Sequence, residues 1–136
     1  MNKQQKDGYS VAGVAVKDGN LFLAKRNKGG SLSEKWEFPG GKLEKNETFE
    51  HALKREFKEE FGVNIIVHSK LCSSRFTHKD RNYELSAYHI TILGDTFSLR
   101  EHTQIHWIPF RELSHIDLAE SDRSLLPELG KKLPDG

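Results

Sequence analysis

Residues 41–63, GKLEKNETFEHALKREFKEEFGV, decide the fold of this chain, because they contain its clearest helix. We predict that this helix runs from Glu47 to Phe61. Asn46 can cap its first turn, and Gly62 can end it in the left-handed conformation. Side chains that recur at three- and four-residue spacing should face a core; they are Phe49, Ala52, Leu53 and Phe57.

Three acidic residues near the end of this helix break the usual rules of helix stability. Glu56, Glu59 and Glu60 fall within an arc of about 100°, where like charges repel one another. Glu59 and Glu60 also lie in the last turn, which favours cations. Three isolated glutamates more often form a solvated acidic face, whereas a bound divalent cation would give them a function. The wider pattern decides between these two interpretations.

That pattern is G-x5-E-x7-R-E-U-x-E-E-x-G-U, in which U is a bulky apolar residue. Its fixed positions are Gly41, Glu47, Arg55, Glu56, Glu59, Glu60 and Gly62, and its apolar positions are Phe57 and Val63. Such a match rarely arises by chance at ordinary residue frequencies. It is the Nudix box, so the chain resembles the Nudix hydrolases. Phe57 stands where the family usually has an aliphatic residue, which affects packing and no charged role.

Three shorter matches make the chain similar to the MutT-type members of this family, which are nucleoside triphosphate pyrophosphohydrolases. Residues 36–42 read WEFPGGK, like the segment that precedes the box in those enzymes. Glu101 precedes Trp107 by six residues, as their loop glutamate precedes a tryptophan. Residues 118–126, LAESDRSLL, look like their base-reading stretch. Each match is weaker than the box, so the family is indicated more sharply than the substrate.

The resemblance implies metal-dependent hydrolysis of a nucleoside triphosphate to the monophosphate and pyrophosphate, as in nucleotide-pool sanitation. Mg²⁺, or Mn²⁺ as a substitute, would orient the phosphates and activate water. The groups expected to hold the metal are the carbonyl of Gly40 and the carboxylates of Glu56, Glu59, Glu60 and Glu101. For Glu101, an ordinary loop acid is the alternative.

Four residues are predicted to be catalytic: Glu47, Arg55, Glu56 and Glu101. The resemblance implies that Arg55 orients the acids and that Glu47 pairs with Arg55. The general base stays open between Glu56 and Glu101, since either carboxylate can take a proton from water.

Four further residues are predicted to bind the substrate: Arg26, Glu37, Phe38 and Asp122. Arg26 aligns with an arginine that contacts phosphate or base in MutT-type enzymes, and a solvated arginine is the alternative. Phe38 either stacks on the base or fills the core. Asp122 either reads the base or is an ordinary acid in the first turn of a helix. As a base reader, Asp122 would favour N–H donors, such as a cytosine amino group or an oxidised guanine edge.

The substrate base therefore stays open between 8-oxo-dGTP and CTP or modified dCTP, with residues 118–126 and the Glu101-His102 pair leaning toward CTP. Dinucleoside polyphosphates and RNA 5′ ends are alternative Nudix substrates. ADP-ribose hydrolases typically carry a proline after the box, and no proline lies between Pro39 and Pro109. The alternative from another class is a non-catalytic Nudix domain that senses nucleotides. Such domains commonly lose box glutamates, which this chain keeps.

Composition fits a soluble globular domain. The chain has 136 residues and a formal net charge of +1, so no basic field indicates a nucleic-acid partner. Cys72 is the only cysteine, which suits a reducing cytoplasm. We see no signal peptide and no membrane span. We expect one Nudix domain over 1–136 with disordered tails at 1–8 and 134–136, located in the cytoplasm. It should bind a nucleotide, form no stable nucleic-acid complex, and exist as a monomer or homodimer.

The rest of the chain predicts an α/β or α+β domain with a mixed sheet, which the resemblance sharpens to the Nudix α/β/α sandwich. Alternating apolar residues indicate strands, and Asp18-Gly19 indicates a hairpin turn. The expected strands are 9–16, 21–25, 36–38, 64–73, 74–78, 83–93 and 105–109. The expected connections are turns at 17–20, 39–41 and 78–82, and loops at 26–35 and 94–104. Helical segments are expected at 111–113 and 120–131, the latter interrupted by Pro127.

Overall fold

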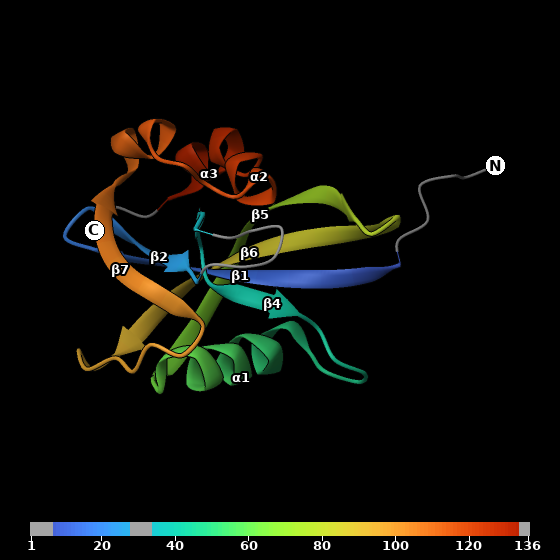
Figure 1. Cartoon of the computed structure of the whole chain (residues 1–136), viewed down its shortest axis with the longest axis horizontal. Helices are drawn as coiled ribbons and strands as arrows, with labels where there is room; N and C mark the ends of the chain where they lie inside the picture. The colour runs from blue at the N-terminus through green and yellow to red at the C-terminus, as the bar shows by residue number, and fades with distance from the viewer. Residues whose placement is uncertain (1–6, 28–33, 134–136) are drawn as a thin grey trace.

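The structure, a computed structural model, describes residues 7–27 and 34–133. In chain order its elements are β1 (Gly8–Lys17), β2 (Asn20–Arg26), β3 (Trp36–Glu37), β4 (Gly40–Lys42), α1 (Phe49–Phe61), β5 (Asn64–His78), β6 (Arg81–Leu93), β7 (His102–Pro109), the 3-10 helix η1 (Phe110–His115), α2 (Glu120–Arg123) and α3 (Leu126–Lys132). A mixed seven-stranded sheet forms the middle layer. Figure 1 shows α1 on one face of this sheet and α2 and α3 on the other. The predicted fold class is therefore confirmed.

The N-terminal strand is longer than we predicted. Gly8, which we placed in a tail, begins β1. The carboxylate of Asp7 anchors this end, because it accepts the backbone N–H of Asn82 at 2.7 Å. The remaining expected tail residues and the middle of the 26–35 loop lie outside the described residues, at 1–6, 134–136 and 28–33. Within the described part, no helix has the length and apolar character needed to cross a membrane.

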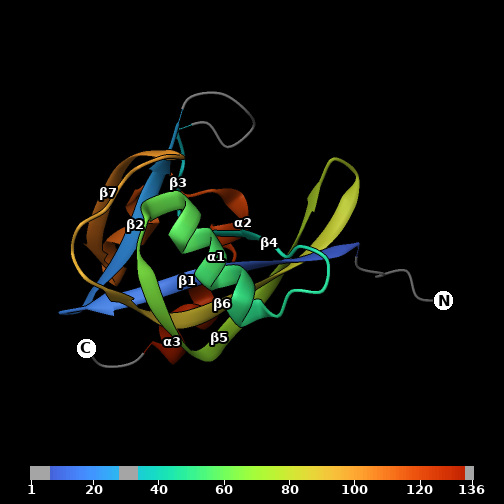
Figure 2. The same ribbon diagram turned by 90° about the horizontal axis from the view of Figure 1, so that it is seen from below.

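The central strand of the sheet is β1. The strands run in the order β3-β2-β1-β6-β5, and β4 pairs with β1 while β7 pairs with β2. β1 is parallel to β6 and antiparallel to β4. The predicted Asp-Gly turn joins β1 to β2, with φ angles of 53° at Asp18 and 79° at Gly19. Because β1 and β2 pair beside this turn, at Val16–Leu21 and Lys17–Asn20, and then diverge, β2 continues with β3 and β7 (Figure 2).

Two apolar clusters hold the layers together, one on each face of the sheet. Under α1, Ala52, Leu53 and Phe57 are fully buried and Phe49 is partly buried, as their spacing predicted. The large Phe57 fits because β1 has a glycine opposite it. A Cβ atom at Gly13 would lie 2.7 Å from Cε1 of Phe57. The cluster on the other face includes Leu113, Leu118, Leu125 and Leu129 from the C-terminal segment.

The N-terminus of α1 differs from our prediction. The helix begins at Phe49, and its N-cap is Thr48, whose side chain accepts the N–H of His51 at 3.0 Å. Asn46 cannot be that cap, since its φ of 67° places it in the left-handed region, outside the extended conformation of an N-cap. Glu47 therefore lies before the helix. At the other end, Gly62 has a φ of 70°, which confirms the predicted C-cap.

Two segments that we predicted as connections are strands. Residues 39–41 were expected to turn, but Gly40–Lys42 forms β4 and pairs with Ser10, Val11 and Ala12 of β1. Residues 102–104 were expected to be loop, but they begin β7 and pair with β2. Both are tertiary effects, because each segment has a low strand propensity and gains its backbone partners from β1 or β2.

One pair of predicted strands is joined in the structure, and one predicted helix is divided. The strands expected at 64–73 and 74–78 are one strand, β5, with irregular pairing around Lys70. The helix expected at 120–131 is instead broken into α2 and α3. Pro127 lies in the first turn of α3, where its missing N–H is tolerated; in the middle of one continuous helix it would remove a hydrogen bond.

Candidate functional site

Arg55, on α1, is the centre of an ion-pair network. Its Nε donates to Oε2 of Glu47 at 2.6 Å, and its Nη2 donates to Oε1 of Glu47 at 3.0 Å. Nη1 donates to the carboxylates of Glu56 and Glu59, at 3.2 and 3.3 Å. The predicted pairing of Arg55 with Glu47 is thus present. The hydrogen bond from Arg55 lowers the pKa of Glu47 to about 2, so Glu47 is a permanent anion at neutral pH.

Glu56 rests against the backbone of β4. A Cβ atom at position 41 would lie 2.1 Å from Oε2 of Glu56, so only glycine leaves room for this carboxylate. The neighbouring residue, Gly40, pairs with Ala12 of β1. The structure therefore brings the Gly40-Gly41 segment and the Glu56 carboxylate into contact, although they are 15 residues apart at the closest, from 41 to 56.

Glu60 is the most deeply buried acid of the box. It is 5% exposed, and its Oε1 has no hydrogen-bond partner among the described residues. Burial raises its pKa far above the ordinary value, and the hydrogen bond to Glu56 and the charges of Glu56 and Glu37 act in the same direction. Desolvated carboxylates that crowd together in this way fit a hard divalent cation, which takes oxygen ligands and would supply the missing partner.

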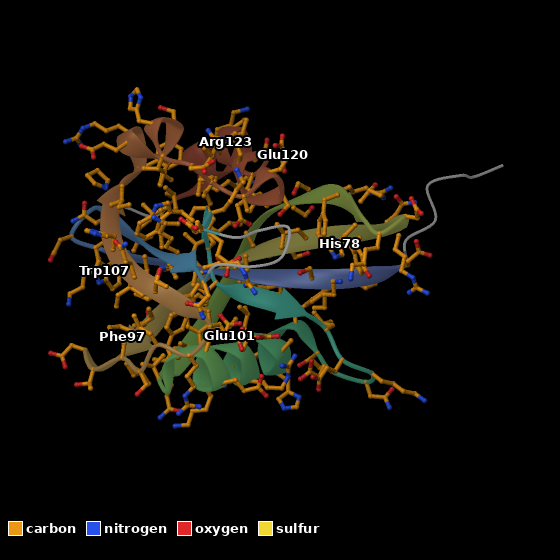
Figure 3. The ribbon with its side chains drawn as sticks, in the orientation of Figure 1. His78, Phe97, Glu101, Trp107, Glu120 and Arg123 are labelled. Atoms are coloured by element: carbon orange, nitrogen blue, oxygen red, sulfur yellow. The ribbon has the colours of Figure 1, made fainter. Side chains whose placement is uncertain are left out.

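The two other predicted metal-binding acids lie further out. The side chain of Glu59 is 61% exposed and is held by Arg55. Glu101 is exposed and lies just before β7, near α1 (Figure 3). Its backbone carbonyl accepts the N–H of Asn27 at 3.3 Å. The structure thus brings together Glu56 and Glu60 and leaves Glu59 and Glu101 at the rim.

The structure adds a residue that sequence reasoning did not assign to the site. His102 is 3% exposed, and its Nε2 lies 2.8 Å from Oε2 of Glu37 and 4.0 Å from Oε1 of Glu60. Its ring stacks on Phe61, with 5.1 Å between the ring centroids. Because 94–104 was predicted as a loop, nothing distinguished an inward His102 from an outward Glu101. Only recognition of β7 as starting at 102 would have done so.

A cleft of about 760 Å³ leads away from these acids. One end is lined by Glu37, Arg26 and the backbone of residues 40–42. The other lies between the β5–β6 hairpin and the start of α2, which His78 and Glu120 mark in Figure 3. Its walls there include Phe76, Leu85, Ala119, Ser121 and Asp122. The cleft therefore has a charged end beside the acids and an end at α2 whose walls mix apolar side chains with polar and charged ones, among them His78, Lys79 and Asp122.

The predicted substrate-binding residues all line this cleft, in different ways. Nη1 of Arg26 donates to Oε2 of Glu37 at 3.2 Å. Oδ2 of Asp122 accepts the backbone N–H of Phe38 at 3.1 Å, and burial raises the pKa of Asp122, as does the charge of Glu37. Phe38 is 2% exposed and packs in the core cluster with Leu118, so the structure favours the packing alternative for its ring.

Comparisons with known proteins agree with this architecture. The NUDIX domain family matches residues 7–129. The chain is 33% identical to the CTP pyrophosphohydrolase of Escherichia coli K12 over 116 residues, which cover 85% of this chain and 86% of that protein. It is 30% identical to the putative 8-oxo-dGTP diphosphatase 2 of Mycobacterium tuberculosis over 130 residues, 90% of this chain and 88% of the relative. The solution structure of the E. coli ORF135 protein superposes with a TM-score of 0.83 at 31% identity, covering 93% and 91% of the two chains.

Proposed function

Because this chain belongs to the Nudix hydrolase family, we propose that it hydrolyses a nucleoside triphosphate to the monophosphate and pyrophosphate. The observation that carries the proposal is the buried Oε1 of Glu60, which has no hydrogen-bond partner among the described residues and lies close to Glu37, a residue that lines the cleft. Relatives named for CTP and for 8-oxo-dGTP support nucleotide-pool sanitation with CTP, modified dCTP or 8-oxo-dGTP as the substrate.

Residues of the box and of β4 would hold the required cation. We assign Mg²⁺, with Mn²⁺ as a substitute, to the carboxylates of Glu56 and Glu60 and the carbonyl of Gly40, with Glu59 and Glu101 completing the set from the rim. A bound divalent cation neutralises phosphate charge and lowers the pKa of a water molecule. A Nudix site needs such neutralisation because phosphoryl transfer depends on positioning and electrostatics more than on covalent chemistry.

The protein groups around this site then have distinct tasks. Arg55, clamped by Glu47, orients the Glu56 carboxylate from one side. Either Glu56 or Glu101 takes the proton from the water that attacks phosphorus, most simply the β phosphorus; the bond to the α-phosphate oxygen then breaks, the nucleoside monophosphate leaves, and the β and γ phosphates form pyrophosphate. Glu56 is the better placed of the two, because its carboxylate already lies against Gly41 inside the site.

The end of the cleft at α2 would receive the base. Asp122 lies there with one carboxylate oxygen held by the Phe38 amide, so its carboxyl group has a defined orientation toward the cleft. Arg26 and Glu37 line the same cleft and would contact the sugar or phosphates. We further propose a cytoplasmic monomer or homodimer without a stable nucleic-acid complex, in line with the net charge of +1 and the single, buried Cys72.

A nucleotide panel tests this function directly. The protein is incubated with CTP, modified dCTP, 8-oxo-dGTP, ordinary nucleotides, dinucleoside polyphosphates and 5′-triphosphorylated RNA, each with Mg²⁺ or with chelator. We expect the protein to release monophosphate and pyrophosphate from a nucleoside triphosphate when Mg²⁺ is present and not when chelator is present. Faster turnover of the dinucleotides or RNA would establish the alternative Nudix substrates. Nucleotide binding with no turnover of any substrate would establish a sensor.

A further inference from the structure

His102 is a buried side chain that the proposed chemistry does not use, yet it contacts two of the acids. Its side chain is fully buried, and Nε2 is 2.8 Å from Oε2 of Glu37. Oε1 of Glu60 lies 4.0 Å from the same nitrogen. Because Oε2 of Glu37 also accepts a hydrogen bond from Arg26, it is an acceptor, and we assign the hydrogen of the ring to Nε2, which donates it to Glu37. Nδ1 has no hydrogen-bond partner in the described part of the chain, so the ring acts through Nε2.

The His102 ring is held rigidly enough to impose this geometry. It lies nearly parallel to the ring of Phe61, with an angle of 13° between the planes. Phe61 is itself fully buried at the end of α1, one residue after Glu60. The same stack therefore fixes both the histidine and the last turn of the helix that carries Glu60.

Glu37 is the partner that receives this hydrogen bond. Its Oε2 also accepts Nη1 of Arg26 at 3.2 Å, so two donors from β2 and β7 converge on one oxygen. Glu37, Glu60 and His102 each have a ligand atom within 4.8 Å of the others. Two carboxylates that approach each other inside a protein repel, and a donor beside them helps to keep them in place.

We propose that His102 is a positioning residue: by donating Nε2–H to Glu37 beside Glu60, it sets the affinity of the acidic site for its divalent cation. This inference rests on the proposed function, because it assumes that Glu60 binds a cation. Groups that orient metal ligands typically change metal affinity by about 10- to 100-fold when they are removed.

The test measures binding of Mn²⁺ to the protein without nucleotide, from the electron paramagnetic resonance signal of the free ion. In His102→Gln the amide nitrogen reaches the position of Nε2, whereas in His102→Asn it stops short. We expect His102→Asn to weaken Mn²⁺ binding about tenfold or more and His102→Gln to stay within about threefold of wild type. The matched control is His106→Asn, an exposed residue of the same strand, which should not change binding.

A double-mutant cycle tests whether His102 acts through Glu37. In a Glu37→Ala background the effect of His102→Asn should shrink to within about threefold, since the partner is gone. Equal Mn²⁺ binding by folded His102→Asn and wild type would overturn the proposal, as would a tenfold loss in His102→Gln. A full effect of His102→Asn without Glu37 would overturn it as well. If His102→Asn does not fold, His102→Ala takes its place in the cycle.

The outcome for the proposed function is read separately, on the wild-type protein. Absence of Mg²⁺-dependent nucleotide hydrolysis there would remove the proposed function, whatever the histidine variants do. Hydrolysis by the wild type together with unchanged Mn²⁺ binding in His102→Asn would remove only the role of His102. A wild-type protein that binds no Mn²⁺ would remove the role of His102 too.

Discussion

The guanidinium of Arg55 donates hydrogen bonds to both carboxylate oxygens of Glu47, from Nε at 2.6 Å and from Nη2 at 3.0 Å. Such a bidentate pair is stronger and more directional than a single contact. Both side chains are largely buried, at 16% and 6% exposed, so the pair is not a simple surface ion pair. It joins the loop before α1 to the helix itself and aligns the remaining guanidinium nitrogen with Glu56.

Replacing this arginine tests the network. Arg55→Ala should lower the free energy of unfolding by about 3 kcal/mol, because Glu47 would stay buried without its partner. Arg55→Lys keeps the charge but loses the fork, so it should fall between Ala and wild type. Urea denaturation measures both. Lys54→Ala, which removes only an exposed pair with Glu50, should change stability by less than about 1 kcal/mol.

Glu60→Gln should separate stability from activity. Burial penalises the ionised form of this carboxyl group, so a neutral amide of the same size should raise the melting temperature of the metal-free protein. The same change should cut turnover by at least about 1000-fold, since several kcal/mol of transition-state stabilisation depend on the cation. Glu59→Gln should cost less, because this side chain is 61% exposed. A Glu60→Gln enzyme with wild-type turnover would contradict the metal assignment.

Gly41→Ala tests the contact between β4 and Glu56. The added methyl group would meet Oε2 of Glu56 at 2.1 Å and push the carboxylate away. We expect a loss of about 100-fold in turnover, since small displacements at a reacting centre have effects of this size. Circular dichroism should show an unchanged fold. The control is Gly8→Ala, where the new Cβ meets the Tyr83 ring at 3.0 Å, away from the acids.

Stability without metal should fall as pH rises above about 5. Burial raises the pKa values of Glu60 and Asp122, so as the pH rises the native state keeps protons that the unfolded state has already released. Each such group lowers the free energy of unfolding by up to about 1.4 kcal/mol per pH unit. Thermal melts in chelator across pH 5 to 8 measure the slope. Glu60→Gln should reduce this slope. A melting temperature that does not depend on pH would contradict the raised pKa values of the two buried acids.

Asp122→Asn should change base preference more than chemistry. The substitution keeps the size of the side chain but replaces a carboxyl oxygen by an NH₂ donor, so groups that donate to Asp122 would lose their partner. We expect the ratio of kcat/KM between CTP and 8-oxo-dGTP to shift by about tenfold or more. Turnover at saturation of the better substrate should change little. Ser121→Ala, on the same cleft wall, is the matched control.

Sequence reasoning found the parts of the molecule that have local signals. The 3.6-residue period located α1, Asp18-Gly19 located the first hairpin, and the box spacing located Glu56 and Glu60. What it missed depends on partners distant in sequence. β4 becomes a strand by pairing with β1 across about 30 residues, from Ser10 to Lys42. His102 turns inward because β7 pairs with β2, and neither fact has a signature within the segment itself.

The helix start was wrong for a related reason. Glu47 has the right charge for a first turn, and Asn46 is a good cap by type. Yet Glu47 is drawn out of the helix by Arg55, which lies eight residues on, and Thr48 becomes the cap. An acid in the first turn stabilises a helix by only a few tenths of a kcal/mol, which is less than the stabilisation from a bidentate ion pair with Arg55.

The divergence of β1 and β2 beyond their turn has a consequence for how this protein can evolve. The acids come from α1 and β3, whereas the far wall of the cleft comes from residues 119–122 and the β5–β6 hairpin. Substitutions in the far wall can change which nucleobase is accepted while the acidic site is inherited unchanged. A new base specificity can thus arise from a few substitutions in the far wall, while the acidic site stays the same.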